Sequence, residues 1–211
     1  MKHLKILGPA AVAAMALTAL IGVSSSSAAE LCSTNTSPCT GTIYGSSTSI
    51  SANLKAGTTS RLTSNFGAIT CKKSTMAGKT TNGEGHGEIT TVSFTGCTDP
   101  FGGSCTFNSV NPPFTVSTAA TGGGNGTITT TATEAHETEG KNPGMTVTCT
   151  GIGLNCTYSR AEMTLNVTGG NPATILAENE SLEFTAGGFC PSETSWDYEY
   201  EITAPKPLFL E

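Results

Sequence analysis

The reactive side chains that form a pattern in this 211-residue chain are its eight cysteines. Cys149 and Cys156 have six residues between them in CTGIGLNCTY, where a threonine follows each cysteine. A similar arrangement recurs in CTDPFGGSCTF, residues 97–107, and Cys32 and Cys39 again have six residues between them. Such pairs can bind a metal ion, act as a redox pair or form structural disulfides, and the compartment decides among these roles.

The N-terminal segment has the three parts of an export signal. A basic tip, MKHLK, precedes the apolar run ILGPAAVAAMALTALIGV and then small residues, with Ser27 and Ala29 at the −3 and −1 positions of a signal-peptidase site. We therefore predict a helical signal peptide over residues 1–29 that is removed on export. The apolar run is also long enough for an uncleaved anchor, which would be the chain's one link to a membrane.

In an exported chain, an even number of cysteines predicts a disulfide framework. Zinc sites use CxxC pairs or mixed Cys and His ligands at short spacing, and no histidine neighbours these pairs. A thioredoxin-like pair needs two intervening residues at the start of a helix. We therefore predict structural disulfides for all eight cysteines: Cys32, Cys39, Cys71, Cys97, Cys105, Cys149, Cys156 and Cys190.

Two of the disulfides are predicted to be local. Cys32 with Cys39, and Cys149 with Cys156, are close enough in the chain to close a hairpin or a tight loop.

The other four cysteines allow two schemes. The repeated motif favours Cys97 with Cys105, which leaves Cys71 to pair with Cys190. Alternatively, Cys71 and Cys97 are equidistant from Glu84 in the turn sequence NGEGHG, so they could face each other across a hairpin, and Cys105 would then pair with Cys190. The first scheme is slightly favoured, and the sequence leaves both open.

The chain after residue 29 has the pattern of strands. Runs such as MTVTCT, MTLNVT and WDYEYEI alternate apolar and polar residues, and turn sequences such as NGEGHG, TGGGNG and TGGNP separate them. This pattern predicts an all-β fold, an antiparallel β-sandwich or flattened barrel of about ten to twelve short strands stapled by disulfides. A length of about 180 residues fits one domain, which we place at residues 30–211.

The charge of the exported chain is acidic. Removal of Lys2 and Lys5 with the signal leaves 8 basic and 16 acidic residues, a formal charge of −8. Nucleic acids and anionic lipids attract basic surfaces, so neither is expected as a partner.

Catalytic and metal-binding candidates are few. Glu84, His86 and Glu88 would share one face of an extended segment, and with His136 and the glutamates of residues 134–137 they could hold a divalent cation. A solvated turn is the favoured interpretation. The chain has no GxSxG motif, and a hydrolase with paired carboxylates is the remaining enzymatic possibility. We expect no catalytic residues, cofactor or metal.

The last predicted strand carries an aromatic row. In SWDYEYEI, Trp196, Tyr198, Tyr200 and Ile202 alternate with acidic residues and therefore share one face. We expect this face to pack in the core. If the row were exposed, it would be a platform on which sugar rings stack.

Six runs that follow the signal peptide are LCSTNTSPC, ISANLKAGTTSRLTSNFGAITC, ITTVSFTGC, GMTVTC, VTGGNPATILA and CPSETSWDYEYEITAPKPLFL. Together they resemble a group of short exported proteins from soil actinobacteria and their relatives. The resemblance covers essentially the whole exported chain and implies secretion by a bacterium. It implies no activity.

The sequence therefore predicts a secreted structural or interaction β-domain without catalytic activity. The alternative is a carbohydrate- or cell-wall-binding module that uses Trp196, Tyr198 and Tyr200. A partner would be another extracellular protein or a polysaccharide.

Overall fold

The computed structural model describes residues 29–81 and 84–211. The predicted signal helix falls almost entirely on residues 1–28 and so lies outside the described residues. Within the described ranges, no helix is long and apolar enough to cross a membrane.

The described residues form fourteen strands and one short helix, which confirms the all-β class. The strands are β1 (Leu31–Cys32), β2 (Ser49–Leu54), β3 (Ser60–Ser64), β4 (Gly67–Thr80), β5 (His86–Thr98), β6 (Ser104–Val110), β7 (Phe114–Gly122), β8 (Asn125–Ala132), β9 (Gly144–Cys149), β10 (Leu154–Ser159), β11 (Glu162–Thr168), β12 (Thr174–Gly188), β13 (Glu193–Ala204) and β14 (Phe209–Leu210), and the helix is α1 (Glu134–Thr138). Twelve strands belong to one antiparallel sheet, and β1 pairs with β14.

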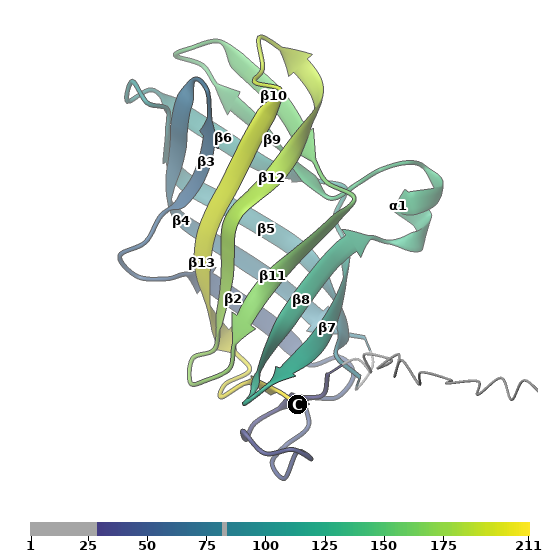
Figure 1. Ribbon diagram of the computed structural model, residues 1–211. Coiled ribbons are helices and arrows are strands. Elements are labelled where there is room, and N and C mark those ends of the chain that lie inside the picture. Colours follow the sequence, from purple (N-terminus) through teal and green to yellow (C-terminus); the bar gives the residue numbers. More distant parts are fainter. Residues whose placement is uncertain (1–28, 82–83) are drawn as a thin grey trace, which may run out of the picture.

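The sheet closes on itself as a barrel (Figure 1). In the described chain, eight strands follow one another as neighbours in the order β2, β4, β5, β7, β8, β11, β12 and β13, and β13 pairs back with β2. We call this set the lower ring. Its strands keep their order in the chain, so it is an up-and-down meander into which short strands are inserted.

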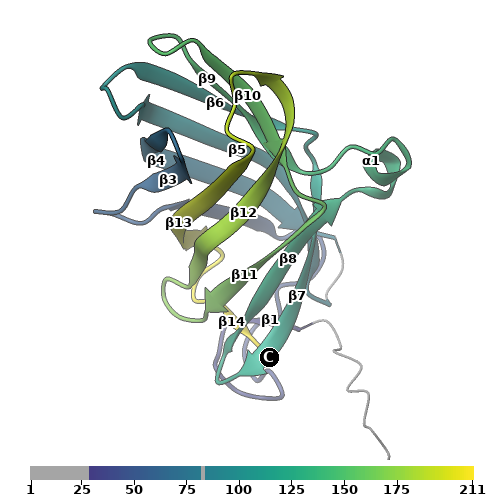
Figure 2. The same cartoon turned by 45° about the horizontal axis from the view of Figure 1, so that its top comes forward.

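The inserted strands close a second ring above the first. The four strands common to both rings, β4, β5, β12 and β13, are 12 to 15 residues long and extend beyond the lower ring. Their upper parts pair with β3, β6 and β10, and β9 joins β6 to β10. We call β3, β4, β5, β6, β9, β10, β12 and β13 the upper ring; Figure 2 shows the two rings as one elongated sheet.

Strand alternation separates the interior from the exterior. In β9, Met145, Val147 and Cys149 are buried, whereas the threonines between them are partly exposed. On the outer face, threonines of adjacent strands form hydrogen bonds. For example, the hydroxyl oxygens of Thr146 and Thr157 are 3.0 Å apart. β-Branched threonine suits an extended backbone, so these outer rows favour strands while keeping the surface polar.

The lower end of the barrel is covered by the two terminal strands. β1 pairs with β14 so that Leu31 lies opposite Leu210, and both side chains are buried. The Ala29 amide donates to the Thr118 carbonyl of β7 at 3.1 Å, and the Glu30 amide donates to the Glu211 carbonyl at 2.8 Å. These contacts fasten the start and the end of the described chain to the rim of the lower ring.

All eight cysteines form disulfides, which are Cys32–Cys39, Cys71–Cys97, Cys105–Cys149 and Cys156–Cys190. The predicted local pair at the N-terminus, Cys32–Cys39, is confirmed. For the other four cysteines, the slightly favoured first scheme is wrong in both of its pairs, and the second scheme is wrong in one of its two pairs. Only the cross-hairpin pair of the second scheme, Cys71–Cys97, is present.

The predicted pair of Cys149 with Cys156 is wrong because of the register of the β9–β10 hairpin. Leu154 lies opposite Cys149, and Cys156 lies opposite Val147. Cys156 instead reaches Cys190, which follows β12.

The predicted pairs Cys97–Cys105, Cys71–Cys190 and Cys105–Cys190 are also wrong. Cys71, Cys97, Cys105 and Cys149 lie directly opposite one another on β4, β5, β6 and β9. This row forms two disulfides, one between β4 and β5 and one between β6 and β9.

We predict that the disulfides differ in their contribution to stability. The Cys156–Cys190 bond spans 34 residues and the Cys32–Cys39 bond spans 7. In the loop-entropy model their removal should lower the free energy of unfolding by about 4 and about 2 kcal/mol, respectively. Denaturant unfolding of the two double-alanine variants would measure this, and a larger loss for the Cys32–Cys39 variant would contradict it.

Candidate functional site

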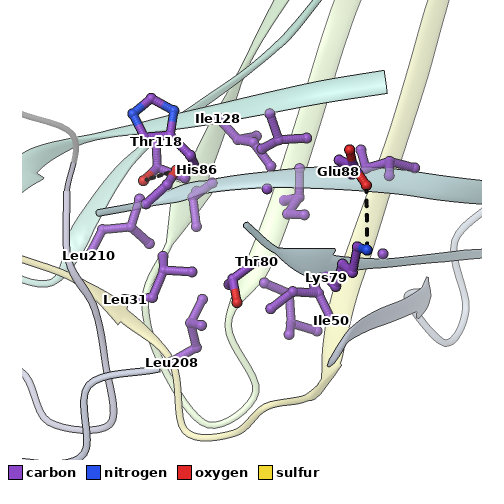
Figure 3. Close-up of a pocket in the computed structure, with 18 of the residues that line it drawn as sticks. Leu31, Ile50, Lys79, Thr80, His86, Glu88, Thr118, Ile128, Leu208 and Leu210 are labelled. Carbon is purple, nitrogen blue, oxygen red and sulfur yellow. Dashed lines mark hydrogen bonds and ion pairs between the residues drawn. The ribbon is translucent and has the colours of Figure 1, made fainter. Parts of the chain in front are cut away.

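The interior of the barrel contains two adjoining cavities of about 70 and 60 Å³. The lower cavity is surrounded by apolar side chains from the lower ring and from the terminal strands, and Figure 3 shows Leu31, Ile128, Leu208 and Leu210 converging on it. Met76, Ile89, Ile128 and Ile175 line both cavities. The two cavities are therefore neighbouring parts of one apolar interior, which we call the lumen.

Three polar side chains of the lower cavity are already engaged. Lys79 and Glu88 form a cross-strand ion pair with an Nζ to Oε2 distance of 3.8 Å (Figure 3). The Thr118 hydroxyl donates to the carbonyls of Ala29 and Gly85, at 3.3 and 3.1 Å. These groups therefore hold the lower rim together.

The upper cavity is lined by adaptable and aromatic side chains. Met76, Met145 and Met163 all contribute to it, and they are the only methionines in the sequence beyond residue 29. A methionine side chain has several rotatable bonds and a polarizable sulfur, so it can adjust to ligands of different shape. Among the described residues, no charged side chain lines this cavity.

The aromatic row of β13 forms one wall of the upper cavity. Trp196, Tyr198 and Tyr200 have exposures of only 8%, 7% and 1%. Neighbouring rings contact each other in tilted and edge-on arrangements, at centroid distances of 4.5 and 4.9 Å. Phe94 of β5 packs on Trp196 at 5.7 Å. The expectation that this row packs in the core is confirmed.

The alternative of an exposed aromatic platform is wrong. Strand β13 has neighbours along both edges, so one of its faces points into the barrel and the other points to solvent. The acidic residues Asp197, Glu199 and Glu201 occupy the outer face, where they are partly exposed.

Two of the three polar groups in this row have ordinary hydrogen-bond partners. The Trp196 Nε1 donates to the Ser60 hydroxyl at 2.8 Å, and the Tyr200 hydroxyl forms a hydrogen bond with the hydroxyl of Ser74. Both partners are themselves buried.

The third polar group, the hydroxyl of Tyr198, has no oxygen or nitrogen partner in the described chain. Its one hydrogen-bond partner among the described residues is the sulfur of Met163, at 3.9 Å. A thioether is a weak acceptor, and an unsatisfied buried hydroxyl is unfavourable. Tyr198 therefore presents unused hydrogen-bonding capacity at the wall of the lumen.

Burial keeps the tyrosines neutral. It raises the pKa of Tyr198 well above its usual value, with smaller contributions from Tyr200 and Glu180. Burial also raises the pKa of Tyr200 to about 12, against the opposing effect of its hydrogen bond with Ser74. At neutral pH both hydroxyls are therefore protonated and can donate.

The residues considered for a cation site lie on different elements. His86 and Glu88 belong to β5, and His136 belongs to α1. The described residues contain no group of three or more His, Cys, Asp or Glu side chains placed to hold a metal ion.

The lumen could not be predicted from the sequence, because residues from many distant segments of the chain form its walls. Met76, Met145 and Met163 are far apart in sequence and meet only when the barrel closes. The alternation within β13 did reveal the aromatic row, although it carried no information about an adjoining cavity.

Comparison with family models, with curated proteins and with solved structures gave no match to this chain. The resemblance to short secreted actinobacterial proteins stays a prediction.

We predict an alkaline unfolding transition. The pKa of Tyr200 in the folded protein, about 12, is above its reference value of 10.0, so the fold favours the neutral phenol. This stabilisation is complete below about pH 10 and is lost as the pH rises through the folded-state value. Tyrosinate absorbance and far-UV circular dichroism should therefore change together above pH 10.

Tyr198→Phe provides a control for the alkaline transition. Phenylalanine has no ionisable group and gives up only the weak contact with Met163, so this variant should unfold at a higher pH than the wild type. Ionisation of all the tyrosines at pH 10 without loss of structure would contradict the prediction.

Proposed function

We propose that the protein binds a small, neutral and mostly apolar molecule in its lumen, and that it does so outside the cell. The observation that carries this proposal is the Tyr198 hydroxyl, which is buried beside an apolar cavity with only the Met163 sulfur as a partner. A ligand oxygen at this position would give the hydroxyl an ordinary acceptor.

The lining of the lumen supports a particular class of ligand. Each cavity has several times the roughly 10–15 Å³ that one water molecule needs, but water also needs polar partners, which an apolar wall does not supply. Apolar surface of a ligand would therefore be favoured. A charged group would lose its hydration without a counter-ion among the described residues of the upper cavity. A ketone, ester or alcohol with a short hydrocarbon chain meets both conditions.

The proposal is for binding without catalysis. It keeps the interpretation of an extracellular interaction domain and moves the interaction from the surface to the interior. Binding of cell-wall polysaccharide through Trp196, Tyr198 and Tyr200 is not favoured, because the lumen is apolar and a sugar chain would leave many hydroxyls without partners.

An extracellular location is supported by the four disulfides, which persist in oxidising compartments. We predict that expression of residues 1–211 in a secreting host releases a chain that begins at Glu30. Intact-mass and N-terminal peptide analysis of the culture medium would test this. A chain that stays in the membrane fraction with residues 1–29 attached would contradict it.

We predict that the lumen discriminates among eight-carbon probes. Trp196 is the only tryptophan and lines the upper cavity, so its fluorescence reports binding there. 2-Octanone should give a saturable change at lower concentration than octane, because it can accept a hydrogen bond from Tyr198. Octanoate should bind most weakly there, because its carboxylate beside Tyr198 in the upper cavity would be buried without a counter-ion. Titration of the wild type with each probe measures the order.

Two variants make the test specific. In Tyr198→Phe, 2-octanone should lose about tenfold in affinity, the value of about one net hydrogen bond, while octane should bind as before. Ile128→Phe adds volume at the junction of the two cavities and should reduce binding of both neutral probes. Absence of a saturable signal for every probe would contradict the proposed function.

A further inference from the structure

Four hairpin turns each hold a large apolar side chain in solvent. Phe66, Phe101, Ile152 and Phe189 have exposures of 55%, 81%, 39% and 96%, respectively. They lie in the turns that join β3 to β4, β5 to β6, β9 to β10 and β12 to β13. We call these four residues the apolar tips.

The strand pairing places the apolar tips at one end of the molecule. The four turns close the hairpins of the upper ring at successive positions around its circumference. In Figures 1 and 2 these turns lie at the end of the barrel opposite the C-terminus. Side chains that are far apart in sequence thus surround one rim.

Phe189 has no role in stabilising its own turn. Its backbone has a φ of 57°, a left-handed conformation that glycine adopts readily and a bulky residue does not. With 96% of its surface exposed, the ring gains almost nothing from packing within the chain. The turn therefore bears backbone strain and an unburied aromatic ring at the same position.

Phe101 is displayed by a well-ordered turn. One carboxylate oxygen of Asp99 accepts hydrogen bonds from the Phe101 and Gly103 amides, at 2.9 and 2.8 Å. Asp99 is itself only 5% exposed. The buried carboxylate of Asp99 thus fixes the backbone of the turn, and the Phe101 ring is left exposed to solvent.

The turns that carry the apolar tips contain almost no charge. In the described turns, which comprise residues 65–66, 99–103, 150–153 and 189–192, Asp99 is the only charged residue, and it is buried. Small and uncharged residues, chiefly glycine, make up much of the remainder. Insertion of these turns into an apolar medium would therefore not require removal of an exposed charge from water.

We propose that the apolar tips dock the protein on the surface of a neutral lipid bilayer. A second copy of the chain is a poorer occupant, because the four side chains expose on the order of 500 Å² if a fully exposed aromatic side chain offers about 200 Å². A stable protein interface buries about 800 Å² on each partner. Separate projecting rings also fit a deformable lipid surface better than a rigid complementary one. The surface is distinct from the lumen, so this proposal is independent of the proposed ligand.

The acidic charge of the chain is compatible with this mode of contact. We predicted from that charge that anionic lipids are not partners, and from the apolar N-terminal run that only an uncleaved signal segment would link the chain to a membrane. The charge excludes electrostatic attraction, whereas the apolar tips act through burial of apolar surface. Binding should accordingly occur on zwitterionic vesicles and change little with salt.

Flotation of the secreted protein with phosphatidylcholine vesicles tests the proposal. We expect binding of the wild type, with little change between about 0.1 and 1 M salt. Phe189→Gly should bind about tenfold more weakly, and Phe101→Ser combined with Phe189→Gly about a hundredfold more weakly.

Stability measurements separate docking from folding. Phe189→Gly should have the same or a higher thermal stability than the wild type, because glycine relieves the left-handed strain. Ile43→Ser is the matched control, because Ile43 is 45% exposed and forms a bridge with Cys32 of β1, at the opposite end. This variant should bind vesicles as the wild type does.

Three results would overturn the proposal. They are an absence of vesicle binding by the wild type, equal binding by the wild type and the double variant, and dimerisation in sedimentation velocity that the double variant abolishes without any binding to vesicles.

Discussion

The structure depends on the closure of its sheet by two long hairpins, β4–β5 and β12–β13. Each of their strands pairs with one set of neighbours in the lower ring and another set in the upper ring. Closure leaves no free edge in either ring and gives every strand one inner and one outer face. The burial of the aromatic row and the polar, threonine-rich exterior both follow from this constraint.

The disulfides brace the two rings unequally. In the described chain, the three bonds other than Cys32–Cys39 lie in the upper ring or beside it, whereas β2, β7, β8 and β11 contain no cysteine. Methionines contribute instead to the walls of the lumen. Covalent links thus fix the end that presents the apolar tips, and the lumen is left with side chains that can adjust to a ligand.

The sequence predicted the fold class because alternation is a local property. Ten to twelve strands were expected, and twelve belong to the main sheet. Closure into two rings was not predictable, because it depends on pairings between distant segments. Alternation alone did not show which face of β13 points inward, because a period of two residues is the same whichever face is buried.

Disulfide connectivity shows how much depends on register. Cys71 and Cys97 were predicted to face each other because they are equidistant from Glu84. They do so only because the β4–β5 pairing has a bulge between Ala77 and Gly78. Near the turn Thr80 faces Gly87, a register that would have put Cys71 opposite Gly96 if it had continued unchanged. The added residue in β5 restores the pairing.

No comparable correction occurs between β9 and β10. Their register stays uniform along the hairpin. Cys156 lies opposite Val147, two residues from Cys149, so the two cysteines are on the same face but do not meet. Spacing of cysteines alone could not distinguish these two hairpins, because a bulge is invisible in the alternation of residue types.

The proposed ligand site in the lumen and the proposed lipid-docking surface lie at different places along the barrel, and packing determines how they relate. The interior of the upper ring is filled by buried groups such as Leu62, Ile69 and Leu154 together with the row of cysteines. The lower end is covered by β1 and β14, which pair through only two residues each. A ligand would therefore meet less resistance at the lower end. A protein resting on lipid through its apolar tips would hold that end toward solvent, so exchange of the ligand and contact with lipid would not compete for the same surface.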